Sequence, residues 1–254
     1  VVQETGAELA LGFDGDCDRC GVVADDGEEV FADKVGVLLA RDLSARIPNA
    51  KFVADVKSTG IFEIDPVLKK NGATVDYWKT GHSYMKRRTH ELGAVAGFEK
   101  SGHYFFNPPV GRGYDDGIVA AIAILEMLDR AGQTKMSALV SGLPKTWGTP
   151  TMAPFCPDDK KYDVVAAMTQ EYETLKETGE TILGQKIVRL VTVNGVRVTL
   201  EDGTWGLIRA SSNKPSLVVV VESPVSEAQM RAMFADLDGR LSKHPEVGAY
   251  DQKI

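Results

Sequence analysis

The sequence has few of the features that mark secreted, membrane-spanning or nucleic-acid-binding proteins. Three cysteines in 254 residues are too few for a disulfide framework, so we expect a reducing, cytoplasmic setting. No apolar run reaches the length of a membrane span, which argues against membrane insertion. The formal net charge of −7 argues against a general nucleic-acid surface. What remains is a globular chain whose 43% hydrophobic content supplies a sizeable core.

The start of the chain also lacks an initiator Met and a basic-then-apolar signal pattern. It begins VVQETGAELALGF, which reads as the middle of a longer protein. We therefore expect a fragment, of a length that fits one large domain or two ordinary ones.

Between residues 30 and 142 the sequence alternates predicted strands and helices. We expect strands at 51–56, 74–79 and 94–99, and helices at 60–72, 83–93 and 115–132. This alternation favours a parallel α/β sheet. The last helix opens with two aspartates, which we interpret as capping residues that complement the helix dipole.

The composition changes at 142–159, where prolines cluster and predict a linker. A long polar helix at about 161–178, short strands and a last helix at about 226–242 follow it. NG at 194–195 and DG at 202–203 are hairpin turn signals. This pattern predicts an antiparallel sheet with helices, an α+β domain.

Three aspartates alternate in the stretch LGFDGDCDRCG (11–21). In an extended segment, the side chains of Asp14, Asp16 and Asp18 point the same way and converge. Carboxylates so near to one another repel unless a cation lies between them, and hard oxygen ligands suit Mg²⁺. A solvated acidic turn is the simpler alternative. An EF-hand fits less well, because Arg19 stands where that loop needs Gly.

Two cysteines in the same stretch raise a different possibility. The Cys-x-x-Cys spacing of Cys17 and Cys20 is found in redox and zinc pairs. There is no second pair, and Cys17 alternates with the aspartates, so we expect it to face away from them. A zinc or thiol-redox protein remains an alternative, which predicts bound zinc or a titratable dithiol.

Four motifs resemble the α-D-phosphohexomutases. FDGDCDR (13–19) resembles their metal-binding loop, usually FDGDGDR, with Cys17 in place of Gly. WKTGHSYMK (78–86) resembles the WKTGHS segment, and GFEKSGHYFF (97–106) the sugar-recognition loop, often GEMSGH. IRASSNKPSLVV (208–219) resembles the phosphate-binding loop, of the form RxSNTxP. The motifs occur in the family's order, and bacterial phosphomannomutase/phosphoglucomutases resemble the chain most.

The resemblance implies a domain order. Residues 1–29 would be the end of domain 2 with the metal-binding loop, and 30–142 a mixed α/β domain 3 with the sugar-recognition loop. Residues 143–254 would be an α+β domain 4, similar to the TATA-box-binding protein, with the phosphate-binding loop. The family's first domain carries a phosphoserine nucleophile in a TASHNP-like loop, and no such stretch occurs in this sequence.

The sugar-recognition motif follows a predicted strand, where open α/β sheets present ligand contacts. Glu99 offers a carboxylate to two sugar hydroxyls, Ser101 a donor or acceptor, and His103 a proton near neutral pH. A polar turn is the alternative for this stretch taken alone. The resemblance assigns Glu99 and Ser101 to the sugar hydroxyls. Lys100 stands where Met is common in the family, which would change the sugar preference.

Two cations near these motifs are further candidates. Lys79 ends a predicted strand beside a helix start, a position that suits a phosphate or sugar oxygen. The resemblance places Lys79 in the active cleft, and we expect Arg19 to pair with substrate or with the phosphorylated nucleophile. We interpret His82, taken alone, as a cap or packing residue, and Lys86 as a weaker candidate.

The motif at 208–219 lies between two predicted strands. Arg209 is suited to grip phosphate through two parallel hydrogen bonds. Ser211, Ser212 and Asn213 add hydroxyl, amide and backbone donors in a tight loop. The family's Ser-Asn-Thr is Ser-Ser-Asn here, and a plain hairpin turn is the alternative.

These resemblances imply a phosphohexomutase, which interconverts hexose 1- and 6-phosphates by Mg²⁺-dependent phosphoryl transfer through a phosphoserine and a bisphosphate. The implied partners are a hexose phosphate and the chain's own missing N-terminal domains, so the chain alone should be inactive. A phosphoglucosamine mutase and a non-catalytic phosphosugar-binding protein are the alternatives. A TASHNP-like serine upstream of Val1 would decide for the enzyme.

Overall fold

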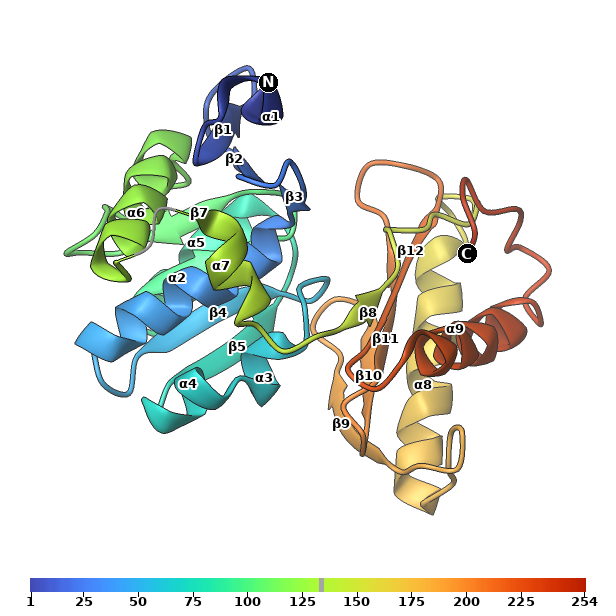
Figure 1. Ribbon diagram of the computed structural model, residues 1–254. Coiled ribbons are helices and arrows are strands. Elements are labelled where there is room, and N and C mark those ends of the chain that lie inside the picture. Colours follow the sequence, from blue (N-terminus) through green and yellow to red (C-terminus); the bar gives the residue numbers. More distant parts are fainter. Residues whose placement is uncertain (133–134) are drawn as a thin grey trace. The chain divides into compact units, whose positions relative to one another are not determined.

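The computed structural model describes residues 1–132 and 135–254 (Figure 1). It divides the chain into two compact units, Val1–Pro144 and Lys145–Ile254. Within the described residues, no helix is both long enough and apolar enough to cross a membrane.

The first unit opens with a small antiparallel sheet that carries the aspartate loop. The one-turn helix α1 (Val2–Thr5) precedes β1 (Leu9–Phe13), β2 (Cys20–Ala24) and β3 (Glu29–Val30), which lie in the order β1-β2-β3. Phe13 at the end of β1 pairs with Cys20 at the start of β2. This register makes residues 14–19 the connecting loop and fixes both of its ends.

The second sheet of this unit has the order β5-β4-β6-β7. Its strands are β4 (Lys51–Asp55), β5 (Thr74–Trp78), β6 (Ala96–Phe98) and β7 (Tyr104–Phe106). β4 runs parallel to β5 and β6, whereas β7 is antiparallel to β6. The parallel arrangement expected for the strands at 51–56, 74–79 and 94–99 is confirmed, and β7 adds an antiparallel edge that was not expected. The chain turns back directly after the sugar-recognition loop, because a hairpin connects antiparallel strands without a crossover helix.

The helices of the first unit after α1 are α2 (Ala32–Arg46), α3 (Ile61–Ile64), α4 (Pro66–Lys70), α5 (His82–Glu91), α6 (Gly117–Arg130) and α7 (Met136–Ser141). The single helix predicted at 60–72 is divided in two. Pro66 disfavours a helical conformation at the preceding residue, and Asp65 has a ψ of 122°. Asp65 then caps α4, since its side chain accepts from the amides of Val67 and Leu68.

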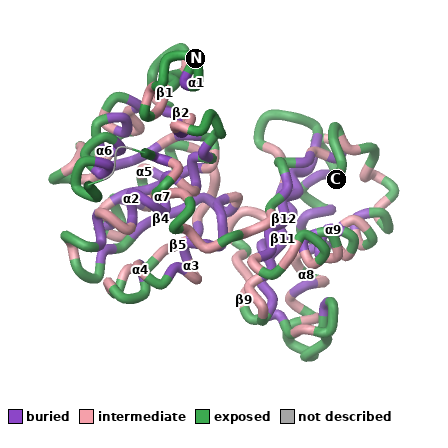
Figure 2. The backbone as a smooth tube through the Cα atoms, in the orientation of Figure 1, coloured by how far each residue is buried: buried purple, intermediate pink, exposed green. Residues whose placement is uncertain are grey.

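An aromatic cluster beneath the sugar-recognition loop anchors the mixed sheet. The ring of Phe98, at the end of β6, lies 5.8–6.4 Å from the rings of Phe52, Phe62 and Phe106. Helix α2 approaches this cluster closely, because a Cβ at Gly36 would lie 2.9 Å from the Phe98 ring. Figure 2 shows buried residues at α2 and β4. Phe98 of β6, the strand that leads into the sugar-recognition loop, is buried among them.

The second unit is an antiparallel sheet packed against two helices. The strand order is β8-β12-β11-β10-β9, formed by β8 (Trp147–Gly148), β9 (Ile187–Val191), β10 (Val196–Leu200), β11 (Trp205–Ala210) and β12 (Leu217–Ser223). Its helices are α8 (Lys161–Thr178) and α9 (Glu227–Leu241). Gly195 and Gly203 have φ values of 78° and 84°, so both predicted hairpin turns require glycine.

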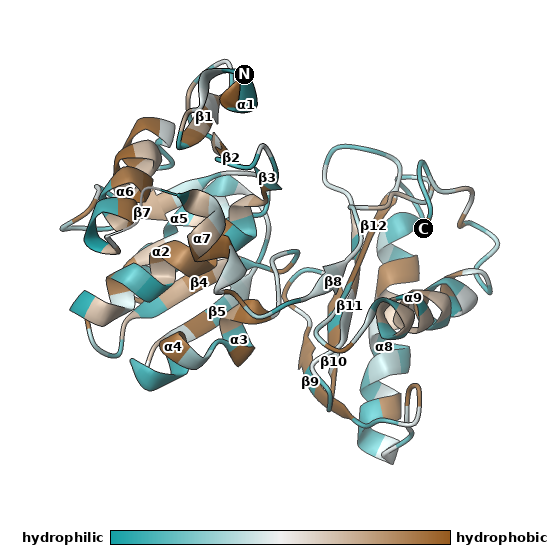
Figure 3. Cartoon of the chain, viewed as in Figure 1, coloured by the Kyte–Doolittle hydropathy of each residue, from teal (hydrophilic) through white to brown (hydrophobic). Residues whose placement is uncertain are grey.

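The core of the second unit follows from strand alternation. Alternate residues of β10, such as Val196 and Val198, pack with Met168 of α8 and Met233 of α9. Figure 3 shows hydrophobic residues along the strands and a mixed hydropathy on α8, which has one buried face. The α+β architecture predicted for this part of the chain is confirmed.

Candidate functional site: metal and sugar loops

The loop between β1 and β2 brings its three aspartates together. Carboxylate oxygens of Asp14, Asp16 and Asp18 lie within 4.8 Å of one another. Oδ1 of Asp18 is shielded from solvent and accepts no hydrogen bond from the described residues. A shielded oxygen without a donor, among clustered hard oxygens, is what a divalent cation such as Mg²⁺ satisfies. The residues present therefore fit the metal that the resemblance implies.

The backbone of this loop is held in an uncommon conformation at Cys17, whose φ is 62°. The Cys17 carbonyl accepts from the amide of Gly117, the first residue of α6, at 2.9 Å. A Cβ at Gly117 would lie 2.8 Å from the Cys17 carbonyl oxygen and 2.7 Å from that of Arg19. The start of α6 therefore packs directly on the loop and supports its shape.

The cysteines of this region do not behave as a pair. Both Cys17 and Cys20 are free, Cys17 exposed and Cys20 buried. Burial raises the pKa of the Cys20 thiol to about 11, so it stays protonated and unreactive. The metal-ligand clusters found among the described residues contain no cysteine. The zinc and thiol-redox alternative has no support from this geometry.

Arg19 pairs within the loop. Its Nε lies 2.5 Å from Oδ2 of Asp14 and 3.7 Å from Oδ1 of Asp18, and its amide donates to Asp14 Oδ1 at 3.2 Å. Desolvation alone would raise the pKa of Asp14, but the hydrogen bonds and positive charge of Arg19 hold it below its ordinary value. Arg19 therefore offsets part of the loop's negative charge.

The sugar-recognition loop lies against the aspartate loop. The amide of Cys20 donates to the carbonyl of Gly102 at 3.1 Å, and Arg19 and His103 form an isolated antiparallel bridge. Gly102 has a φ of 100°, a value that favours glycine. Backbone hydrogen bonds therefore join two motifs that are far apart in the sequence.

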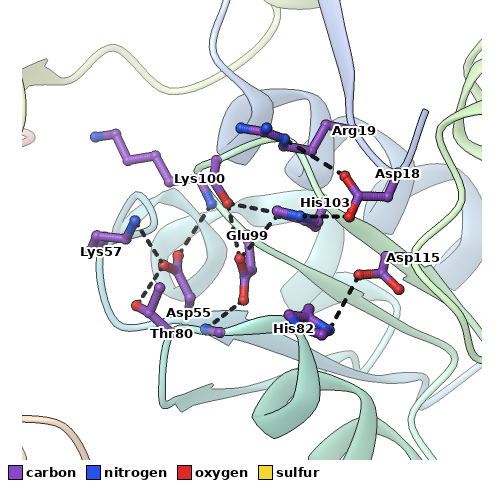
Figure 4. A network of polar contacts seen from close by, with 12 residues as sticks. Asp18, Arg19, Asp55, Lys57, Thr80, His82, Glu99, Lys100, His103 and Asp115 are labelled. Atoms are coloured by element: carbon purple, nitrogen blue, oxygen red, sulfur yellow. Dashed lines mark hydrogen bonds and ion pairs between the residues drawn. The ribbon is translucent and has the colours of Figure 1, made fainter. Parts of the chain in front are cut away.

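The side chains of the sugar-recognition loop form a connected set (Figure 4). The Ser101 hydroxyl lies 2.9 Å from Oε2 of Glu99 and 3.0 Å from Nδ1 of His103. Oε1 of Glu99 accepts from the amide of Gly81, in the WKTGHS segment, at 2.8 Å. The carboxylate of Glu99 is thus held from two loops.

His103 lies between the two loops. Its Nδ1 is 3.3 Å from Oε2 of Glu99, and its Nε2 is 3.4 Å from Oδ2 of Asp18. Burial acts to lower the pKa of His103, but the hydrogen bond to Glu99 and the charges of Glu99, Asp18 and Asp115 outweigh it, so the pKa is raised. The imidazolium is favoured, and His103 is suited to hold or donate a proton.

Sequence reasoning missed Asp115. We read both aspartates before α6 as capping residues, but only the Asp116 side chain caps the helix. Asp115 Oδ1 lies 3.0 Å from Nζ of Lys86, and Oδ2 lies 3.8 Å from Nδ1 of His82. Asp115 also forms a second candidate metal cluster with Asp18 and His103. The paired aspartates were the available signal, but local sequence does not say which one turns inward.

The predicted cation Lys79 lies over Tyr84, with its Nζ 5.7 Å from the centre of the ring. The structure also adds Asp55, Lys57 and Thr80, which sequence reasoning did not single out. All three follow or end strands at the carboxyl edge of the mixed sheet. That position was a usable signal, because open α/β sheets bind ligands at this edge.

In the second unit, the motif at 208–219 forms the turn between β11 and β12. Arg209 is buried near the end of β11, and its Nη1 donates to the Ala210 carbonyl at 3.0 Å. Ser212 and Asn213 are exposed at the tip. The Ser211 amide donates to the Ser216 carbonyl at 3.0 Å, which closes the loop. A short polar loop with exposed donors is suited to an oxyanion.

Comparisons with known proteins agree with these motifs. The family model described as phosphoglucomutase/phosphomannomutase, alpha/beta/alpha domain III, matches residues 31–147. The model for the C-terminal domain of the same family matches residues 156–240. The chain belongs to the phosphoglucomutase/phosphomannomutase family. The resemblance and the fold class expected from the sequence are therefore confirmed.

Two curated relatives and one solved structure illustrate the similarity. A phosphomannomutase/phosphoglucomutase of Pseudomonas putida is 35% identical over 91% of this chain and 46% of its own length. A phosphoglucomutase of Neisseria gonorrhoeae is 34% identical over 87% of this chain and 45% of its own. The crystal structure of a phosphoglucomutase/phosphomannomutase family protein from Burkholderia thailandensis has a TM-score of 0.79 and 32% identity, and the match covers 95% of this chain and 48% of that one. The chain spans about half the length of the curated relatives it matches.

Proposed function

We propose that this chain supplies the metal-, sugar- and phosphate-binding residues of a phosphohexomutase that interconverts hexose 1-phosphates and hexose 6-phosphates. The observation that carries the proposal is the contact of the two loops at His103, which lies 3.4 Å from Asp18 and 3.3 Å from Glu99. Relatives named phosphomannomutase/phosphoglucomutase and phosphoglucomutase support the same class of reaction. The phosphoserine and bisphosphate steps belong to the proposal for the whole enzyme.

Each predicted site residue of the first unit has a role in this proposal. Glu99 and Ser101 bind sugar hydroxyls, while His103 holds a proton for an oxygen of the substrate. Arg19 and Lys79 stabilise negative charge on phosphoryl oxygens. The carboxylates of Asp14, Asp16 and Asp18 would hold Mg²⁺. When bound, Mg²⁺ neutralises charge in phosphoryl transfer.

In the second unit, we assign phosphate recognition to Arg209, Ser211, Ser212 and Asn213. The exposed loop tip supports this role, because a backbone turn flanked by serines presents several donors to one anion. The proposed partners are a hexose phosphate and the N-terminal domains that correspond to the half of the relatives that this chain does not match. Three free cysteines agree with a cytoplasmic location.

Calorimetric titration of the chain with mannose 1-phosphate, glucose 1-phosphate and glucosamine 1-phosphate tests the proposal. We expect binding that Arg209→Ala abolishes and that Arg231→Ala, on the exposed face of α9, leaves unchanged. The order of affinities separates a phosphomannomutase/phosphoglucomutase from a phosphoglucosamine mutase. Absence of binding for all three sugars, or equal losses in both variants, would count against the proposed function.

A second measurement concerns turnover. Because the proposed reaction needs a phosphoserine that the family carries in a TASHNP-like loop, the purified chain should show no mutase activity in a coupled assay. Detectable turnover by residues 1–254 would show that the reaction does not require a phosphoserine from such a loop.

A further inference from the structure

A buried carboxylate lies beneath the sugar-recognition loop. Asp55 ends β4, which has β5 on one side and β6 on the other, and its side chain is 0% exposed. Oδ1 accepts from the Ser58 hydroxyl at 2.6 Å, and Oδ2 accepts from the Thr80 hydroxyl at 2.9 Å. Nζ of Lys57 lies 3.6 Å from Oδ2. The carboxylate therefore ties the segment after β4 to the segment after β5.

The same carboxylate also reaches the loop after β6, since the amide of Lys100 donates to Oδ1 of Asp55 at 3.3 Å. Figure 4 shows Asp55 between Lys57, Thr80 and Lys100, with Glu99 beside them. One buried side chain thus contacts three loops that follow three neighbouring strands.

Two of these contacts are to residues next to the groups that hold Glu99. Lys100, whose amide Asp55 accepts, is the next residue after Glu99. Thr80, whose hydroxyl Asp55 accepts, precedes Gly81, the residue whose amide donates to Oε1 of Glu99 at 2.8 Å. Asp55 therefore holds the backbone that carries the Glu99 carboxylate and also the backbone that orients it.

We propose that Asp55 is the positioning residue for Glu99, and this inference rests on the proposed sugar-binding role of Glu99. Asp55 is fully buried and does not touch the sugar. It acts by keeping the loops of Gly81 and Lys100 in one arrangement before the sugar binds, so that less ordering is needed on binding.

The test compares two buried aspartates of the same unit. Asp65 is also 0% exposed and caps α4, and the groups that donate to its side chain, two amides of α4 and the Arg41 guanidinium, lie outside the three loops. Asp55→Asn and Asp65→Asn therefore remove the same charge from equally buried positions. Two quantities are measured on residues 1–254: calorimetric affinity for mannose 1-phosphate, and amide hydrogen exchange at Gly81 and Lys100 by NMR.

We expect Asp55→Asn to weaken binding by at least about tenfold and to speed exchange at Gly81 and Lys100. Asp65→Asn should bind within about twofold of the unchanged chain, because it leaves the loops intact. Unaltered binding and exchange in Asp55→Asn, or equal losses in Asp65→Asn, would overturn the inference.

Two further arms keep the result interpretable. If the unchanged chain does not bind mannose 1-phosphate, the proposed function fails, and exchange at Gly81 still decides whether Asp55 holds the loops. If Asp55→Asn does not fold, Thr80→Val removes one of its hydrogen bonds at similar side-chain volume. That variant should show a smaller change in the same direction, and unchanged exchange at Gly81 would then refute the role.

Discussion

Replacement of Cys17 by glycine should stabilise the first unit. Cys17 has a φ of 62° in the aspartate loop, at the position where the motif FDGDGDR, which this loop resembles, has glycine. A side chain in this left-handed region costs about 1–2 kcal/mol, which Cys17→Gly removes. Glycine adds about 0.5–1 kcal/mol of conformational entropy to the unfolded chain, which opposes the gain. With the middle of each range, the net stabilisation expected is about 0.5–1 kcal/mol.

Cys17→Ala is the matched control, because it removes the thiol and keeps the Cβ that causes the strain. The Cys17 side chain is exposed, and its weak contact with the Asp14 carbonyl, at 3.7 Å, is lost in both variants. The difference between the two variants therefore isolates the backbone term. For a unit of this size, it corresponds to a shift in Tm of roughly 1–4 °C.

The assay is urea unfolding followed by amide NMR signals of the first unit, because the two units need not unfold together. We expect Cys17→Gly to unfold at a higher urea concentration than Cys17→Ala. Equal midpoints, or a less stable glycine variant, would refute the reasoning that the loop stores backbone strain at this position.

Three other predictions use different measurements. A thiol reagent should label Cys17 in the native chain and reach Cys20 and Cys156 only after unfolding, because both are buried and burial raises their pKa; fast labelling of all three would contradict the described packing. Asp18→Asn should weaken calorimetric Mg²⁺ affinity by at least about tenfold, through the loss of one anionic ligand, and unchanged affinity would exclude the aspartate loop as the metal site. Burial acts to raise the pKa of Asp202, but its hydrogen bonds outweigh this and lower it. Its contribution to the free energy of unfolding is therefore present above about pH 4 and lost as pH falls through the folded-state pKa. In Asp202→Asn, the free energy of unfolding should therefore change less with pH in that window, and an unchanged pH dependence would contradict this role.

Local patterns were sufficient for much of the fold. Short apolar segments alternating with helical ones indicated the strands of the first unit, and the glycines at 195 and 203 marked the hairpin turns that the second unit contains. The single helix predicted at 60–72 was an avoidable error, since Pro66 restrains the residue before it. The antiparallel β7 was not predicted, because a three-residue strand after a polar loop has too little periodicity to detect.

The sequence by itself determined which chemistry is available: three carboxylates at alternate positions, the Glu-Ser-His set of the sugar-recognition loop, and the family to which the chain belongs. Only the tertiary structure decided the partners of these groups. It paired Arg19 with Asp14, turned Asp115 toward Lys86, and placed Asp55 beneath three loops. The physical reason is that most of these hydrogen bonds and ion pairs join loops and helices that are far apart in the sequence, and these are brought together by the packing of the whole sheet rather than by local sequence.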